Sequence, residues 1–383
     1  MKQKNIGVYT CNRSEYSRLK SVLSAIKEHS GLNLQIVVGG SHLLERYGYT
    51  VNDIENDNFA IEEKIQTVVE GTTTAAMAKS TGLAIIGLTT CFLRLKLDVL
   101  LVVGDRYDML PSVITASFLN IPIAHIQGGE KTGTIDESIR HAVTKLSHLH
   151  FPATQKGKEL ILKMDEMSDR VFVTGCPSID ILLNTKSIDR QTLFRSPPIP
   201  SKVGNISPSP EKDYLLLIQH PVTTEASDSY NQMMETLKAI DKFRMQTILI
   251  YPNLDAGSDD MISALRRFIL SNNCSYLFCF KHIPMEIFIN LMRYALCMVG
   301  NSSAGIRESC YFGVPCVNIG TRQKNREHGQ NVVTVDYNNL EIEDAINKQL
   351  KHGKYPVEYV YGDGKAGKII ADILFNKDIE IQK

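Results

Sequence analysis

Side chains able to transfer protons are concentrated in two motifs of the first half of the chain. Asp105 lies in VVGDRYD, and Gln127, Glu130 and Asp136 lie in HIQGGEKTGTIDESIRH. Carboxyl groups on neighbouring loops can be held in fixed relation as an acid and a base. Aspartate is also common in turns and at helix starts, where it only caps the backbone. The two motifs therefore indicate an acid–base site, and a structural role stays open for each residue.

A motif of the second half, GNSSAGIRE, has the composition of an anion-binding turn. Asn301, Ser302 and Ser303 precede a short predicted helix that extends to about Phe312, and Glu308 lies within it. Serine caps such helices, and the free N–H groups at their positive end bind anions such as a diphosphate. Glu308 could accept hydrogen bonds from ribose hydroxyl groups. A capped helix without a ligand explains the same residues.

Further candidate residues accompany these motifs. Arg13 and Ser14 start a predicted helix in TCNRSEYS, and Arg106 lies in VVGDRYD. Arg322 belongs to a cationic loop, GTRQKNREHGQNV, and His220 ends an apolar segment in LIQHPVTT. Guanidinium groups bind phosphate well, and imidazole titrates near neutral pH. These residues are candidates for phosphate contacts, while a solvated loop and a structural histidine also explain Arg322 and His220.

Short apolar segments alternate with amphipathic segments of helical length along the chain. This alternation is typical of βα units with a parallel sheet. The predicted strands are Ile6–Thr10, Leu34–Val38, Val99–Val103, Ile121–Ile126, His148–Pro152 and Val171–Thr174, then Tyr214–Gln219, Thr247–Tyr251, Tyr276–Phe280, Cys297–Gly300, Cys316–Ile319 and Val332–Val335. Two successive sets of strands predict an α/β chain with two Rossmann-like domains.

A Pro-rich segment with little periodicity separates the two sets. We predict an N-terminal domain with the catalytic carboxylates over 1–184, a linker over 185–212 and a C-terminal domain with the anion-binding motif over 213–362. The remaining residues, 363–383, are expected to form a helix and tail that pack back on the N-terminal domain. Two such domains indicate the GT-B architecture with an interdomain cleft, where loops after the strands carry the chemistry.

Composition excludes several classes of function. The charges balance, with 42 Lys and Arg against 42 Asp and Glu, so we expect neither a nucleic-acid nor a membrane partner. No apolar run approaches the roughly 20 residues of a membrane span, and a cytoplasmic location is expected. The eight cysteines show no C-x-x-C motif, which favours buried thiols over a metal site. G-x-G-x-x-G and G-x-x-x-x-G-K-[ST] are also missing, and we expect no cofactor.

Taken in order, TCNRSEYS, VVGDRYD, HIQGGEKTGTIDESIRHAVTKL, GCPSID, QHPVTT, YPNLDAGS and GNSSAGIRE resemble the motifs of the hydrolysing UDP-N-acetylglucosamine 2-epimerases. The family includes half of a bifunctional animal enzyme and bacterial relatives from sialic and legionaminic acid pathways. The resemblance implies that UDP-N-acetylglucosamine, or a 2,4-diacetamido-6-deoxy analogue, reacts with water to give N-acetylmannosamine, or its analogue, and UDP. In that chemistry UDP leaves by elimination across C1 and C2, and water then adds to the 2-acetamidoglucal.

The resemblance also implies roles for individual residues. Asp105 and Asp136 match the acid–base carboxylates, and His220 matches a histidine near the leaving phosphate. Residues expected to bind UDP or the sugar are Arg13, Ser14, Arg106, Asn253, His282, Asn301, Ser302, Ser303, Glu308 and Arg322.

One position departs from the family pattern. The animal enzyme has a catalytic glutamate where this chain has Gln127. An amide cannot act as a base near neutral pH. Three explanations stay open: Gln127 binds the substrate, another group such as Glu130 acts in its place, or the glutamine is an inactivating substitution.

The expected partners are a UDP-sugar substrate, the UDP product and further copies of the chain, as a homodimer or homotetramer. The apolar stretch 83–97 is a candidate interface, although a core helix would have the same composition. Two other functions stay open. A GT-B glycosyltransferase would pass the sugar to an acceptor, and a nucleotide-sugar-binding protein would bind UDP tightly without turnover.

Overall fold

The computed structural model describes residues 3–132, 135–195, 207–379 and 381. Contacts along the chain divide it into two units. The first is formed by Met1–Lys131, Ile135–Asn184 and Tyr361–Lys383, and the second mainly by Thr185–Val360. The last helix of the chain therefore belongs to the same unit as the first strand.

The first unit is built on a parallel sheet with strand order β3-β2-β1-β4-β5-β6. Its strands are β1 (Lys4–Thr10), β2 (Leu32–Val38), β3 (Ile61–Lys64), β4 (Val99–Val103), β5 (Ile123–Ile126) and β6 (Leu149–Phe151). Successive residues of the central strand β4 pack into opposite core clusters, Val99 and Leu101 on one face and Leu100 and Val102 on the other. A strand covered on both faces must be apolar throughout, as VLLVV is.

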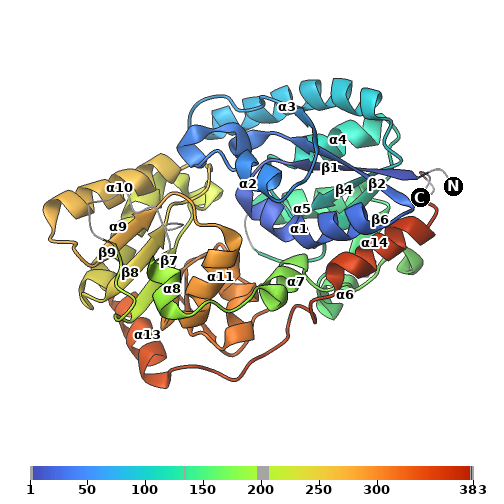
Figure 1. The fold of residues 1–383 in the computed structure, drawn as a ribbon. Coiled ribbons are helices and arrows are strands. Elements are labelled where there is room, and N and C mark those ends of the chain that lie inside the picture. Colours follow the sequence, from blue (N-terminus) through green and yellow to red (C-terminus); the bar gives the residue numbers. More distant parts are fainter. Residues whose placement is uncertain (1–2, 133–134, 196–206, 380, 382–383) are drawn as a thin grey trace. The chain divides into compact units, whose positions relative to one another are not determined.

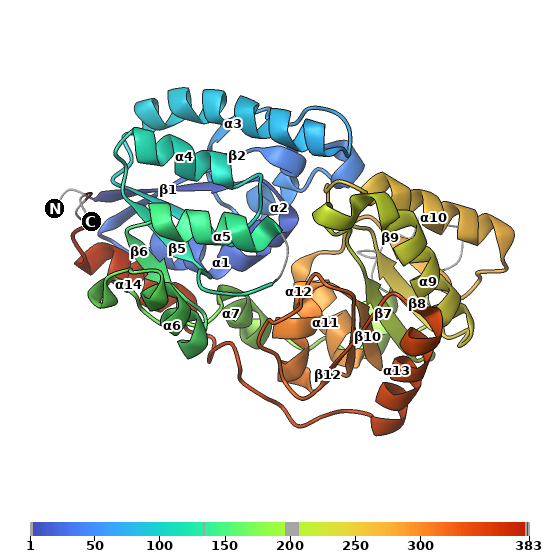
Figure 2. The ribbon, with the colours of Figure 1, turned by 180° about the vertical axis from the view of Figure 1, so that it is seen from behind.

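Helices cover both faces of this sheet, as Figure 1 and, from behind, Figure 2 show. On one face pack α1 (Arg13–Glu28), α2 (Val51–Asn56) and α14 (Ala366–Asn376), and on the other α3 (Thr74–Leu95), α4 (Leu110–Phe118) and α5 (Ile135–Leu146). The unit also contains α6 (Gln155–Lys163) and α7 (Pro177–Asn184).

Helix α14 returns to the first unit and packs against α1 and α7. Asp180 on α7 accepts hydrogen bonds from the backbone N–H groups of Ala366 and Gly367, in the first turn of α14. Burial raises the pKa of this carboxyl group. The amino-terminal strand is tied to the same region, because the Lys4 ammonium donates to the carbonyl oxygens of Leu374 and Lys377.

The prediction of a strand over Val171–Thr174 was wrong, because this segment forms a single bridge, between Val171 and His150. The N–H groups of Phe172 and Thr174 donate to the carbonyl oxygens of His150 and Pro152. Pro152 has no N–H group to donate in return, so the ladder stops there. The strand that was not predicted is β3, at the edge of the sheet opposite β6. Its sequence, IEEK, is mostly charged because the strand is only half-buried.

Helix α3 is the one described helix long and apolar enough to cross a membrane by length and composition, with mean hydropathy 1.4 over 18 residues. It passes on average hydropathy although Lys79 and Arg94 interrupt its apolar residues, so it is not an uninterrupted apolar run. A buried stripe that includes Ala84, Leu88 and Leu95 packs in the core of the first unit, and α3 also contacts α4. A core helix with a second, exposed apolar stripe accounts for this hydropathy.

The second unit repeats the architecture, with strand order β12-β11-β10-β7-β8-β9. Its parallel strands are β7 (Tyr214–Ile218), β8 (Gln246–Ile250), β9 (Leu277–Phe280), β10 (Cys297–Gly300), β11 (Cys316–Ile319) and β12 (Val332–Val335). Helices α9 (Ser229–Asp241), α10 (Ser258–Ser271) and α13 (Asn339–His352) pack on one face, and α8 (Arg190–Arg195), α11 (Met285–Tyr294) and α12 (Ser303–Arg307) on the other.

The segment predicted as a linker contains α8. Leu193 and Phe194 of this helix are buried in the core of the second unit. Of the remaining predicted linker, 196–206 lies outside the described residues.

Each sheet has one place where the direction of strand addition reverses. In the first unit β1 lies between β2 and β4, and in the second β7 lies between β8 and β10. Open parallel sheets bind ligands beyond the carboxyl ends of the strands at such a reversal. The loops after β1, β4, β7 and β10 are therefore the places where a site is expected.

Candidate active site

Three of the predicted acid–base residues lie around one buried arginine, Arg140. Its guanidinium forms an ion pair with the Asp105 carboxylate, which follows β4, and donates to the backbone carbonyl of Glu130, which follows β5. Asp136 stands one turn earlier on α5, on the same face of the helix. Arg140 is fully buried, while Asp136 is half-buried. The arginine thus ties two strand-end loops to the helix that carries Asp136.

Gln127 directly follows β5 and adopts a left-handed conformation, with φ of 65°. Its Oε1 accepts a hydrogen bond from Arg18 Nη1 at 3.0 Å, and its Nε2 donates to Cys176 Sγ at 2.6 Å. Both ends of the amide are engaged, and the side chain is buried. Sequence reasoning missed Arg18 and Cys176; for Arg18 a signal existed, since it lies four residues after Ser14 on the same face of α1.

His125 supports this arrangement without titrating near neutral pH. Its Nε2 bonds to the carbonyl oxygen of Gly104 at 2.8 Å, and its Nδ1 lies 3.2 Å from Thr144 Oγ1. Burial lowers the pKa of His125 to about 3. The ring is therefore neutral and holds the loop after β4 against α5.

Arg13 and Ser14 occupy the first turn of α1, directly after β1. Asn12 caps this helix by accepting from the N–H of Glu15 at 3.1 Å, which places both predicted contacts at the helix start. Burial lowers the pKa of Arg13, and the Asp53 carboxylate opposes that shift.

Arg106 was predicted to contact phosphate. In the structure its guanidinium donates to Asp108, with Nε 3.2 Å from Oδ1 and Nη2 3.3 Å from Oδ2. Asn12 Nδ2 donates to the same carboxylate at 3.2 Å. Asp108 therefore links the loop after β4 to the start of α1.

In the second unit, the reversal point is bridged by His220 and Asn301. The backbone N–H of His220 donates to Asn301 Oδ1 at 2.7 Å, and Asn301 Nδ2 donates back to the carbonyl oxygen of His220 at 2.8 Å. His220 Nδ1 accepts from the backbone N–H of Asn253 at 3.2 Å. The loops after β7, β8 and β10 are thus joined, and Nε2 is the nitrogen of His220 that carries the proton in the neutral ring. His282 follows β9 at the sheet edge, two strands from β7.

The turn after β10 has the backbone geometry of a close approach. Gly300 has φ of 119°, and a Cβ there would lie 2.1 Å from the carbonyl oxygen of Ile218, so another side chain would not fit. Ser302 caps α12 by accepting from Ala304 N at 3.3 Å. Ser302 and Ser303 are half-exposed, and Glu308 is buried at the end of the helix.

Two details of this turn differ from the prediction. The helix is α only over Ser303–Arg307, and a 3₁₀ turn over Ser309–Phe312 follows before Gly313 ends it in a left-handed conformation. Five residues align few peptide dipoles, so fixed N–H groups and neighbouring cations must contribute more to binding an anion than the dipole does.

The predicted cationic loop lies beside this turn. Arg322 Nη1 and Gln323 Nε2 donate to the carbonyl oxygen of Asn301 at 3.3 and 3.0 Å. Lys324 is exposed, whereas Arg326 is buried and donates to Gln323 Oε1 at 2.6 Å. Arg322 therefore contacts the Gly300–Ser303 turn through the carbonyl oxygen of Asn301.

Two parallel six-stranded sheets of this strand order, each covered by helices, define an α/β protein of the GT-B class, as predicted. In shape the chain is similar to the crystal structure of UDP-GlcNAc 2-epimerase from Neisseria meningitidis bound to UDP-GlcNAc. It superimposes with a TM-score of 0.80 at 18% identity, over 98% of this chain and 100% of that one.

The UDP-N-acetylglucosamine 2-epimerase family model matches residues 24–375, and the chain belongs to this family. It is similar to the hydrolysing UDP-N,N'-diacetylbacillosamine 2-epimerase of Legionella pneumophila, with 34% identity over 94% of this chain and 92% of the relative. It is also similar to the UDP-N-acetylglucosamine 2-epimerase of Neisseria meningitidis, with 30% identity over 94% of this chain and 91% of the relative.

Proposed function

We propose that this protein is a hydrolysing UDP-sugar 2-epimerase, which converts a UDP-2-acetamido sugar and water to UDP and the free sugar inverted at C2. The product would enter sialic acid or related nonulosonic acid synthesis. The observation that carries the proposal is the buried Arg140, which holds Asp105 and the Glu130 backbone beside the helix that presents Asp136. A reaction that moves protons at C2 needs carboxyl groups positioned in this way.

The proposed reaction has two steps. A carboxylate takes the proton from C2 while the bond between C1 and the phosphate oxygen breaks, so UDP leaves and a 2-acetamidoglucal forms. Water then supplies OH to C1, and a proton is returned to C2 from the opposite face. Asp105 and Asp136 are the groups that we assign to these proton transfers.

The second unit is assigned to the leaving group. Negative charge builds up on the diphosphate as UDP departs, and fixed donors at that place lower the barrier. The turn over Gly300–Ser303, the Arg322 guanidinium and His220 are the donors that we propose, because His220 and Arg322 both bond to Asn301. Glu308 is proposed to accept from the ribose.

Two sugars are candidates for the substrate. The relatives described above are named for UDP-N,N'-diacetylbacillosamine and for UDP-N-acetylglucosamine, which differ at C4 and C6 of the sugar. We propose the diacetamido sugar first, because the relative named for it has the higher identity.

The proposed function is tested by incubation with each nucleotide sugar in deuterium oxide. Release of UDP and of a C2-inverted free sugar that carries deuterium at C2 is expected, as measured by NMR. Free sugar without deuterium would contradict the elimination. Transfer of the sugar to an added acceptor would indicate a glycosyltransferase, and tight UDP binding without turnover would indicate a binding protein.

A Gln127→Glu variant tests the departure from the family pattern. The amide donates to Cys176 and accepts from Arg18, and a carboxylate keeps the second contact but loses the N–H group donated to Cys176. We therefore expect kcat to stay equal or to fall by up to about tenfold, the effect of one lost hydrogen bond. A kcat at least tenfold above that of the unchanged protein would show that the glutamine has inactivated an ancestral base.

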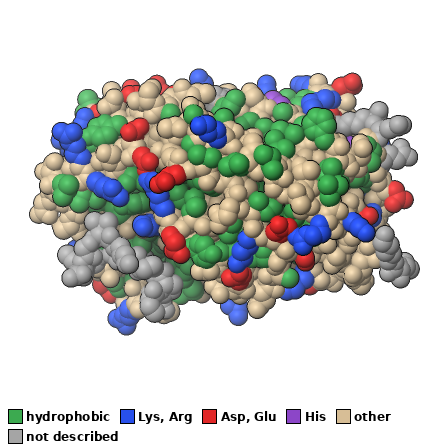
Figure 3. Space-filling view, turned by 90° about the horizontal axis from the view of Figure 1, so that it is seen from above, with side chains coloured by type: hydrophobic (Ala, Val, Ile, Leu, Met, Phe, Trp, Pro, Cys, Tyr) green, Lys and Arg blue, Asp and Glu red, His purple; other side chains and the backbone are tan. Residues whose placement is uncertain are grey.

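We further propose that the protein is a cytoplasmic homodimer or homotetramer that associates through α3. Leu83, Ile86 and Leu93 lie on one stripe of this helix with exposed fractions of 45%, 70% and 62%. Figure 3 looks onto the side of the molecule that carries α3 and shows hydrophobic side chains gathered there. Exposed apolar surface of this kind is typical of subunit interfaces.

An Ile86→Glu, Leu93→Glu double variant is expected to lower the molar mass in light scattering after size exclusion, since buried charges oppose association. Leu270→Glu is the matched control, because Leu270 is 87% exposed on α10. A monomeric unchanged protein, or an oligomer that survives the double substitution, would contradict the interface.

A further inference from the structure

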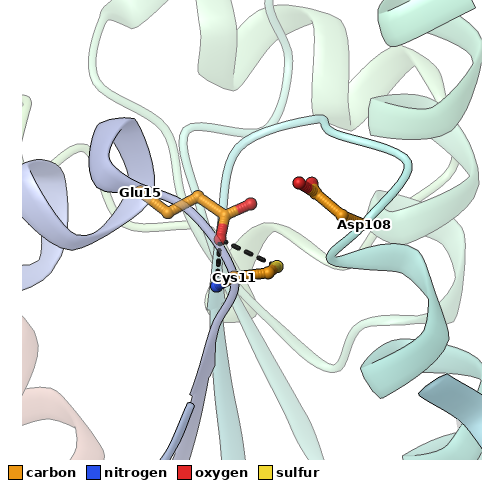
Figure 4. A group of neighbouring side chains, drawn as sticks. All are labelled: Cys11, Glu15 and Asp108. Carbon is orange, nitrogen blue, oxygen red and sulfur yellow. Dashed lines mark hydrogen bonds between the residues drawn. The ribbon is translucent and has the colours of Figure 1, made fainter. Parts of the chain in front are cut away.

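A cluster of three acidic groups lies beneath the start of α1, apart from the carboxyl groups around Arg140. Cys11 directly follows β1, Glu15 is in the first turn of α1, and Asp108 lies in the loop after β4. One ligand atom of each, the sulfur or a carboxylate oxygen, lies within 4.8 Å of the others. Figure 4 shows the second carboxyl oxygen of Glu15 pointing toward Asp108.

The hydrogen bonds of the cluster leave one atom without a partner. Glu15 Oε2 accepts from the backbone N–H of Cys11 at 3.0 Å and from its thiol at 3.1 Å. Glu15 Oε1 is buried and has no hydrogen-bond partner among the described residues, in a side chain that is 1% exposed. A buried carboxylate oxygen without a donor is costly, whereas a protonated one is neutral.

The charges around Glu15 favour the same state. Those that face it are Asp108 and Arg106 from the loop after β4, and Cys11 and Tyr9 from the end of β1. Burial, followed by the Asp108 charge, raises the pKa of Glu15 to about 7, while the hydrogen bonds from Cys11 and the charge of Arg106 oppose the shift. Burial also raises the pKa of Cys11 and Tyr9, so neither adds a negative charge near neutral pH.

A bound metal cation, instead of a proton on Glu15, could also neutralise the negative charge of Glu15 and Asp108. Both oxygens of Asp108 already accept hydrogen bonds, from Arg106 and from Asn12. The Arg106 guanidinium would also repel a metal ion at that position. A proton on Glu15 resolves the same repulsion without disturbing these contacts.

We propose that Glu15 is a positioning residue that acts in its protonated form, keeping the Asn12–Ser14 turn and Arg106 in the arrangement that receives the UDP-sugar. This role rests on the proposed function. Loss of the proton puts the carboxylate of the buried Glu15 beside that of the half-buried Asp108 and draws Arg106 away from Asp108. Substrate affinity should therefore fall as Glu15 ionises, with KM affected more than kcat.

A Glu15→Gln variant separates this role from ordinary packing. The amide has the shape of the protonated carboxyl group, keeps an acceptor for Cys11 and cannot ionise. Glu28→Gln is the matched control, because Glu28 ends the same helix and is exposed. Glu15→Ala should weaken UDP binding at every pH, whereas Glu15→Gln should not.

Thermal unfolding without substrate tests the ionisation by itself. The folded pKa of Glu15 lies above its ordinary value of 4.5, so its stabilising contribution is present below that value and is lost as the pH rises through about 7. The melting temperature of Glu15→Gln should therefore rise relative to the unchanged protein between pH 5 and 8, while Glu28→Gln shows no such trend. A constant difference over this range would overturn the proposal.

Calorimetric titration with UDP tests the positioning. If only the protonated form binds well, the affinity of the unchanged protein should fall about tenfold from pH 6 to pH 8 relative to that of Glu15→Gln. UDP's own ionisation affects both proteins equally. Parallel pH profiles would overturn the positioning role. Absence of UDP binding at every pH would overturn the proposed function, while the thermal comparison would still report the state of Glu15.

The same two measurements with EDTA, and with Zn²⁺ as the probe, distinguish a proton from a cation. The expected result is that EDTA changes neither profile. A pH response that disappears with EDTA and returns with Zn²⁺ would overturn the proposal, because it would make the three groups ligands of a metal ion.

Discussion

An Asp136→Asn variant is expected to release UDP from its nucleotide sugar with kcat lowered by about 10²–10⁴-fold, the contribution typical of a general acid or base. Asp136 is half-buried in the first turn of α5, so the amide fits in its place. It cannot take up or return a proton near neutral pH. The KM should change little, since the amide keeps the size and polarity of the side chain.

The matched control is Glu137→Gln. Glu137 is the next residue, is also half-buried, and likewise adds a negative charge to the first turn of α5. Both variants lose an interaction with the helix dipole of about 0.3–1 kcal/mol, and Glu137→Gln also changes the contact with His141 Nε2 at 3.7 Å, so the two should melt at similar temperatures. A kcat for Asp136→Asn within threefold of that for Glu137→Gln would remove Asp136 from the mechanism.

An Arg140→Met variant is expected to lose about 3–5 kcal/mol of unfolding free energy, because it leaves Asp105 as a buried charge without its partner. Arg140 is 0% exposed, and its guanidinium also satisfies the carbonyl of Glu130. Methionine fills much of the same volume, so the cost comes from charge rather than from a cavity. Urea unfolding followed by circular dichroism measures the change, and turnover should be lost as well.

A double variant, Arg140→Met with Asp105→Asn, provides the control for this assignment. Removing both charges should restore part of the lost stability, because neither partner is then buried alone. Turnover should not return, since Asp105 is assigned to proton transfer. A single variant that loses less than about 1 kcal/mol would show that the ion pair does not hold the two loops to α5.

Eleven of the twelve strands were predictable because they are apolar; ten of these are largely buried, and β12 (VVTV) keeps the apolar signal although only Val332 is buried. The exception, β3, is a half-buried edge strand with charged side chains, and such a strand has no hydrophobic period to read. The error at Val171–Thr174 has a different source. That segment is extended and partly apolar, but Pro152 on the neighbouring segment lacks the N–H group that a ladder needs.

The candidate site shows the same division. Asp105, Asp136 and the Gly300–Ser303 turn could be proposed from the sequence because chemistry of this kind requires particular residue types in the loops and helix starts that follow strands. The bonding partners of Asp105 and Gln127 could not be read from the sequence, because Arg140, Arg18 and Cys176 lie far along the chain from them. Gln127 shows both parts of this. Its amide side chain cannot act as a base, which the sequence shows, but its hydrogen bonds to Arg18 and Cys176 are known only from the fold.

By itself the sequence determined the α/β class, the two Rossmann-like units, the family and most of the residues proposed for the site, since these follow from periodic burial and local motifs. The tertiary structure alone decided that Arg140 pairs with Asp105, that Arg106 pairs with Asp108, and that Glu15 is buried beside that carboxylate. The physical reason is that charge–charge interactions and burial depend on distances in space, which neither spacing nor composition records.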